Sequence, residues 1–205
     1  MMKLRRIILV HGAGAYGGKS NLFNLMLYSH IPCLCFRYGL VLTVWGWWHT
    51  RSGAELLSKV FLQGDLVISH SHGALVADRA MRRYRERTGV PSFISLIALS
   101  PALEQDYTFS DGWDAIDVFY NPGDKLSWYA SHIPWPFPAH EWGSMMSTGI
   151  LGRDIKKNEH NYLIPRLVDN VDAEHGNYLV HPLVNKFAHK LFLYIKVWSR
   201  SKICN

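Results

Sequence analysis

Short apolar runs alternate with amphipathic stretches along the chain. Four runs rich in Ile, Leu and Val predict strands of a parallel sheet, because a strand covered on both faces carries apolar residues almost continuously. A fifth run combines β-branched and aromatic residues, which favour a strand by composition. The five predicted strands are 5–12, 40–47, 65–69, 92–103 and 115–124.

Helical periodicity marks most segments between these strands. The helix expected from about His72 onward has an apolar stripe and a basic back. The segment 181–198 repeats apolar residues at helical spacing with lysines opposite, and shorter helices are expected at 21–30 and 53–62. Strands that alternate with helices predict an α/β fold, with a mostly parallel sheet between two helical layers. We expect one such domain over 1–205.

Composition and charge narrow the class of protein. The chain has 205 residues and is 48% hydrophobic, enough for one domain with a substantial core. Its net charge is +6, but the arginines cluster at 79–87, where they suit a solvated helix face better than a nucleic-acid site. Three cysteines are too few for a disulfide framework or a zinc site. Without a signal peptide or membrane span, we expect a soluble cytoplasmic protein of undetermined oligomeric state.

Several predicted strands end in residues suited to acyl transfer. His11 and Gly12 follow the first strand. Ser71 follows the third and Asp124 the fifth, and His175 precedes the last helix. Chemistry in parallel α/β sheets collects at the carboxyl ends of the strands. These residues are therefore expected to meet at one edge of the sheet.

The turn at 69–73, with the sequence SHSHG, is open to three interpretations. It could hold a nucleophilic Ser71, it could begin a histidine metal site, or it could be a polar turn that caps a helix. A dinuclear metal-hydrolase signature would continue with aspartate and histidine. Ala74 and Leu75 stand there instead and cannot bind metal, so a metal-dependent hydrolase is disfavoured.

The glycine-rich segment 11–20, HGAGAYGGKS, is close to a nucleotide phosphate loop. The pattern Gly-x4-Gly-Lys-Ser would require glycine at position 13, where the chain has Ala13. No candidate magnesium ligand stands out beyond Asp65 and Asp117. A phosphoryl-transfer enzyme remains an alternative, but it leaves the other strand-end residues unexplained.

The motif at 69–73 and the order of the elements resemble the α/β-hydrolase superfamily, in particular a small esterase or lipase-like member. The nucleophile turn of that family reads small-x-Ser-x-small, and SHSHG matches it with Ser69 in place of the commoner glycine. Small residues are needed there because the turn is strained and lifts the serine hydroxyl clear of the backbone. The resemblance covers nearly the whole chain.

This resemblance implies a catalytic triad in the order Ser, acid, His. Ser71 would be the nucleophile, Asp124 the acid and His175 the base. Asp117 competes with Asp124, but it falls within a predicted strand and is expected to face a polar neighbour. His181 competes with His175, but it is expected at the start of the last helix.

The resemblance also implies an oxyanion hole of two backbone N–H groups. One would belong to His72, directly after the nucleophile, and the other to Ala13 in the loop after His11 and Gly12. His11 would support this loop and would not transfer protons.

Together these features predict a serine hydrolase that cleaves a carboxylic ester or related acyl bond. The substrate would be a small or lipid-like acyl compound, and no metal or organic cofactor, nucleic-acid partner or stable membrane insertion is expected. A catalytically silent binding protein of the same fold is the alternative from another class of function.

Prolines interrupt the range 127–165, while Trp135, Phe137, Trp142, Met145 and Met146 supply apolar surface. This insertion is open to two interpretations, core packing or a flap over the Ser71 pocket.

Overall fold

A single sheet of six strands organises the computed structural model of the chain. The structure describes residues 4–12, 21–38, 46–126, 143–151, 153–164, 175, 177–180 and 183–201. The strands are β1 (Arg6–Val10), β2 (Cys33–Phe36), β3 (Asp65–His70), β4 (Ser95–Leu99), β5 (Ile116–Tyr120) and β6 (Glu159–Leu163).

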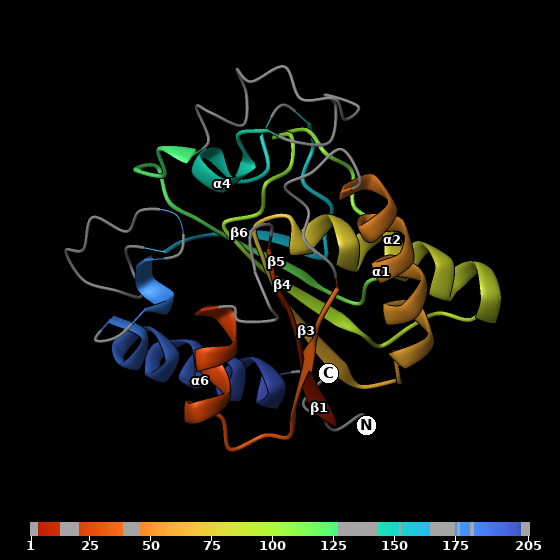
Figure 1. Cartoon of the computed structure of the whole chain (residues 1–205), viewed down its shortest axis with the longest axis horizontal. Helices are drawn as coiled ribbons and strands as arrows, with labels where there is room; N and C mark the ends of the chain where they lie inside the picture. The colour runs from red at the N-terminus through yellow and green to blue at the C-terminus, as the bar shows by residue number, and fades with distance from the viewer. Residues whose placement is uncertain are drawn as a thin grey trace.

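All neighbouring strands of this sheet run parallel, in the order β2-β1-β3-β4-β5-β6 (Figure 1). The predicted mostly parallel sheet is confirmed. Because the strands are parallel, the carboxyl ends of β1, β3 and β5 lie at the same edge of the sheet.

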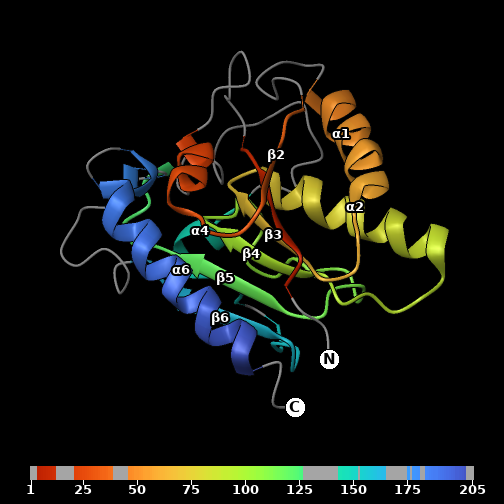
Figure 2. The ribbon, with the colours of Figure 1, turned by 90° about the horizontal axis from the view of Figure 1, so that it is seen from below.

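Helices cover both faces of the sheet, as expected for a three-layer α/β fold (Figure 2). The helical elements are η2 (Asn21–Tyr28), α1 (Gly46–Val60), α2 (Gly73–Thr88), α4 (Met145–Thr148), η4 (Asn177–Leu179) and α6 (Leu183–Ser201). Helices α1 and α2 pack against each other on one face, and α6 packs with η2 and η4 on the other.

Alternation along the strands divides the core into two layers. On β1, Ile8 and Val10 belong to the layer beneath α1 and α2, whereas Ile7 and Leu9 belong to the layer beneath α6. All four side chains are fully buried. This explains why β1 reads as a continuous apolar run, since a parallel strand between two helical layers has no solvent face.

Two strands differ from the sequence-based prediction. Strand β2 lies at Cys33–Phe36, whereas we expect a strand at 40–47 from the sequence. In the structure, residues 46 and 47 begin helix α1, and residues 40–45 lie outside the described residues. Strand β6 lies within 127–165, where no strand was expected. Both are edge strands, and only one residue of each is buried. Strand β6, EHNYL, carries no apolar run, and the apolar run of β2, CLCF, is only four residues long.

Candidate active site

Ser71 occupies the turn between β3 and α2. Its backbone adopts φ 54°, in the left-handed region that residues other than glycine rarely enter. The Ser71 N–H donates to the carbonyl oxygen of Leu99, 3.0 Å away, which ties the turn to the end of β4. The serine is thus held in a strained strand-to-helix turn, the local geometry that the SHSHG motif predicts.

Two glycines allow the chain to close tightly around Ser71. A Cβ atom on Gly12 would lie 2.7 Å from Ser71 Cβ and 3.3 Å from Ser71 Oγ. A Cβ atom on Gly73 would overlap the carbonyl oxygens of Val10 and His11. The first glycine therefore brings the loop after β1 against the serine hydroxyl, and the second lets α2 begin directly against the end of β1.

A turn after β5 positions Asp124. The Asp124 N–H donates to Asn121 O at 2.9 Å, and the Gly123 N–H donates to Asn121 Oδ1 at 3.1 Å, which confirms the predicted turn. The buried Asp124 carboxylate accepts from the Leu126 N–H through Oδ1 at 3.1 Å. Its other oxygen, Oδ2, lies 2.8 Å from His175 Nδ1. Two residues 51 positions apart in sequence therefore meet through one hydrogen bond.

Asp117, the competing acid, makes other contacts. Its carboxylate accepts from the Tyr194 hydroxyl at 2.8 Å and lies 3.1 Å from His160 Nδ1. The side chain is almost wholly buried and belongs to the middle of β5, away from the strand end. These polar neighbours fit the expectation that Asp117 serves a contact within the fold.

The imidazole of His70 lies against that of His175, which the sequence did not foretell. Their ring centroids are 4.8 Å apart with the planes tilted by 40°. Burial, followed by the charges of His175 and His11, lowers the pKa of His70 well below its usual value. Its Nε2 atom is buried without a hydrogen-bond partner among the described residues. Since His70 adjoins Ser71 in the chain, this contact brings His175 beside the serine turn.

Tyr178 closes the same side of the site from η4. Its ring is fully buried, with its centroid 6.2 Å from that of His70. Its hydroxyl lies 3.0 Å from Ser100 Oγ, and burial raises the pKa of this phenol. No motif of the sequence analysis points to Tyr178.

His11 is bound to the backbone through both ring nitrogens. Nδ1 lies 2.7 Å from Gly12 O, and Nε2 accepts from the Tyr38 N–H at 3.2 Å. The Tyr38 ring stacks on the imidazole at 4.2 Å, and its hydroxyl donates to His11 O at 2.7 Å. Burial lowers the pKa of His11. These contacts suit a supporting role in the loop after β1.

His72 precedes α2 and is also held by its side chain. Nε2 lies 2.8 Å from Thr50 Oγ1 on α1. Burial, with smaller effects of Arg79 and His11, lowers the pKa of His72 to about 3. Ala13, the other predicted oxyanion residue, lies outside the described residues, as does His181.

The range 127–165 is described only in part. Met145 and Met146 on α4 are fully buried, so these two side chains pack in the core. Trp135, Phe137 and Trp142 lie outside the described residues.

Among the described residues, no group of three or more His, Cys, Asp or Glu side chains is arranged to hold a metal ion. In the same part of the chain, every helix is too short or too polar to cross a membrane.

Similarity to known proteins is found at the level of structure. Neither protein-family models nor curated protein sequences match the chain. The structure of EstE5 soaked with p-nitrophenyl butyrate matches with a TM-score of 0.57 and 12% identity, over 100% of this chain and 79% of that one. A structure from a study of two fungal esterases from Rhizomucor miehei matches with a TM-score of 0.51 and 14% identity, over 96% and 77% of the two chains. At these identities the similarity concerns the fold.

Proposed function

Because the chain has an α/β-hydrolase fold, we propose that it is a serine hydrolase that cleaves a carboxylic ester or a related acyl bond through an acyl-Ser71 intermediate. The observation that carries this proposal is the Asp124–His175 hydrogen bond of 2.8 Å, which lies beside the strained serine turn. The esterase neighbours in structure agree with this reaction class.

Ser71 is the proposed nucleophile. A serine hydroxyl is weakly nucleophilic and needs a base that removes its proton as it attacks a carbonyl carbon. The turn at Ser71 resembles the strained elbow that exposes such a hydroxyl at the carboxyl edge of a sheet. The proton would pass to His175, and the bond formed would join Ser71 Oγ to the acyl carbon.

His175 is the proposed base and then acid. An ionised Asp124 accepts hydrogen bonds only, so the proton between the two residues belongs to His175 Nδ1. That leaves Nε2 as the nitrogen that takes the proton from Ser71 and later gives it to the leaving alcohol. Water would then attack the acyl-enzyme with the same assistance. Asp124 would orient the imidazole and stabilise its charged form.

The negative oxygen formed in each attack requires donors close to Ser71. The N–H of His72 comes at the start of α2, where N–H groups have no acceptor within the helix. The second donor would be the N–H of Ala13. Its neighbour Gly12 supports this assignment, because Gly12 Cα lies so close to Ser71 that an added Cβ would be 3.3 Å from the hydroxyl.

Covalent labelling tests the proposal directly. A fluorophosphonate probe should react once per chain, at Ser71, and Ser71→Ala should abolish labelling and ester hydrolysis while the far-ultraviolet circular dichroism stays unchanged. Ser100→Ala is the matched control, because Ser100 also has a positive φ, 42°, at the end of the next strand. Labelling that persists in Ser71→Ala would overturn the assignment. A folded protein that never labels would favour the silent binding protein.

A further inference from the structure

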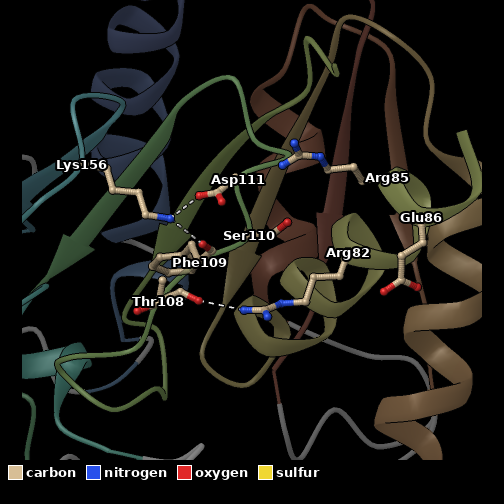
Figure 3. Close-up of a pocket in the computed structure, with 8 residues that line it drawn as sticks. All are labelled: Arg82, Arg85, Glu86, Thr108, Phe109, Ser110, Asp111 and Lys156. Carbon is tan, nitrogen blue, oxygen red and sulfur yellow. Dashed lines mark hydrogen bonds and ion pairs between the residues drawn. The ribbon is translucent and has the colours of Figure 1, made fainter. Parts of the chain in front are cut away.

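The basic face of α2 is largely neutralised by contacts within the protein. Most arginines between 79 and 87 have a partner, and Figure 3 shows one of these contacts. Arg82 donates to the Asp78 carboxylate from Nε at 3.1 Å and to Thr108 O from its NH2 group at 2.8 Å. Arg83 donates to the Glu55 carboxylate at 2.5 Å. Arg87 donates to Ser58 O at 2.6 Å. Arg85 differs, because no described residue supplies a hydrogen bond or ion pair to its guanidinium.

Arg85 lines a cavity between α2 and the loops that flank β5. The cavity has a volume of about 490 Å³. Arg82 and Arg85 enter it from α2, Thr108 and Ser110 from the loop before β5, and Lys156 from the loop before β6 (Figure 3). The described wall therefore combines three cationic groups with two hydroxyls.

Two carboxylates, Asp111 and Glu86, line the same cavity. Asp111 is engaged by Lys156, whose Nζ lies 2.5 Å from its carboxylate. The hydrogen bond and charge of Lys156, followed by the charges of Arg85 and Arg82, lower the pKa of Asp111. Glu86 lies at the end of the cavity opposite Lys156 (Figure 3). Asp111 therefore interacts electrostatically with Arg85, although no hydrogen bond or close ion pair joins Arg85 to either carboxylate among the described residues.

We propose that this cavity binds a phosphate group, either free phosphate or the phosphate of a small organic monoester, with the Arg85 guanidinium as its main ligand. A guanidinium presents a fork of N–H donors that matches two phosphate oxygens. The hydroxyls of Thr108 and Ser110 can donate to the remaining oxygens. A carboxylate has only two oxygens and would leave part of this donor set unused. The volume leaves room for an organic group beside the phosphate.

This site is separate from Ser71. Arg85 comes twelve positions after Gly73, the first residue of the helix, which corresponds to about 18 Å along the helix axis. No residue of the cavity belongs to the proposed triad. Phosphate binding and ester hydrolysis can therefore succeed or fail independently.

Calorimetric titration of the full chain tests the site. Inorganic phosphate and glycerol 3-phosphate are titrated separately at constant ionic strength, and each should bind saturably at one site. Tighter binding of glycerol 3-phosphate would identify an organic monoester as the ligand, and equal binding would identify free phosphate. Arg85→Gln should weaken binding by at least about tenfold, because it removes a charge-assisted pair. Lys156→Gln should weaken it as well.

Arg83→Gln is the matched control. It removes the same charge from the same helix, but Arg83 pairs with Glu55 on α1 and does not line the cavity. Its affinity for phosphate should stay within about twofold of the parent protein, since only diffuse charge is lost. Equal losses in Arg83→Gln and Arg85→Gln, acetate binding as tight as phosphate, or no saturable binding would each overturn the proposal. Fluorophosphonate labelling of Arg85→Gln should equal that of the parent chain.

Discussion

Gly12→Ala is the most informative single change at the proposed site. It adds one methyl group at a position where the loop after β1 meets Ser71. The new Cβ would lie 2.7 Å from Ser71 Cβ and 2.9 Å from the carbonyl oxygen of His70. Both contacts involve the backbone or the first side-chain atom, so rotation of a flexible side chain cannot relieve them. Either the loop or the serine turn must move.

The size of that movement sets the expected loss of activity. Carbon atoms in ordinary contact are about 3.5–4.0 Å apart, so relief of the 2.7 Å contact requires a shift of roughly 1 Å. A misplacement of about 1 Å at reacting groups costs about 100-fold in rate. Overpacking of this kind also destabilises a fold by about 1–3 kcal/mol. We therefore expect kcat/KM on a chromogenic short-chain ester to fall at least about 100-fold, with a modest loss of stability.

Gly89→Ala separates the two effects. Gly89 caps α2 at its far end with φ 65°, and an added Cβ there would meet no atom within 4 Å. A residue other than glycine in this conformation costs about 1–2 kcal/mol, comparable to the overpacking at Gly12. Both variants should therefore lose similar stability in urea, while only Gly12→Ala loses kcat/KM and the rate of fluorophosphonate labelling. Parental activity in a folded Gly12→Ala would refute the placement of the reaction at Ser71.

The remaining predictions concern the histidines and their partners. His175→Ala should lower kcat by several orders of magnitude, and Asp124→Asn should lower it by somewhat less, because the base remains in Asp124→Asn. The measurement is the steady-state rate at saturating ester, and parental activity in either variant would contradict the triad. His70→Phe should keep the ring contact with His175 and should not lower the melting temperature, since it replaces a buried nitrogen that lacks a partner; His70→Ala should lower both stability and kcat/KM. Stability should fall as pH drops from about 6.5 towards 3, because His72 stays uncharged in the folded chain to a pKa of about 3 while the unfolded chain takes up a proton. Urea titrations of His72→Gln should show a flatter fall, and an unchanged slope would exclude His72 as its source.

The inner strands could be predicted from the sequence because their environment leaves a local signal. Strand β1 lies between two helical layers, and its apolar run follows from that position. The edge strand β6 carries no such signal. In β6 only Glu159 is buried, and it is held there by Arg153 at 2.8 and 3.0 Å, so the burial depends on an ion pair that spacing along the chain does not reveal. The run at 40–47 was assigned to a strand by composition, yet α1 begins at Gly46.

Parts of the site were predictable for a similar reason. The turn before Asp124 depends on Asn121 and the two residues that follow it, which is a purely local pattern. The position of His175 in a loop distinguished it from the other histidines as the expected partner of Asp124, and the two side chains are hydrogen-bonded. The contact between His70 and His175 depends on how two distant segments fold together, and no local pattern encodes it. The same holds for Tyr178, whose hydroxyl reaches Ser100 across the end of the sheet.

The strained backbone at Ser71 has a consequence for the evolution of the chain. A residue with a Cβ atom at φ 54° costs about 1–2 kcal/mol, a sizeable part of the 5–15 kcal/mol that typically separates folded from unfolded proteins. Ser71→Gly would relieve this strain and should unfold at a higher temperature than Ser71→Ala, which keeps it. A descendant released from selection for the hydroxyl would therefore gain stability by mutation to glycine. If Ser71 is the nucleophile proposed above, its chemistry must offset this thermodynamic cost for serine to persist at the position.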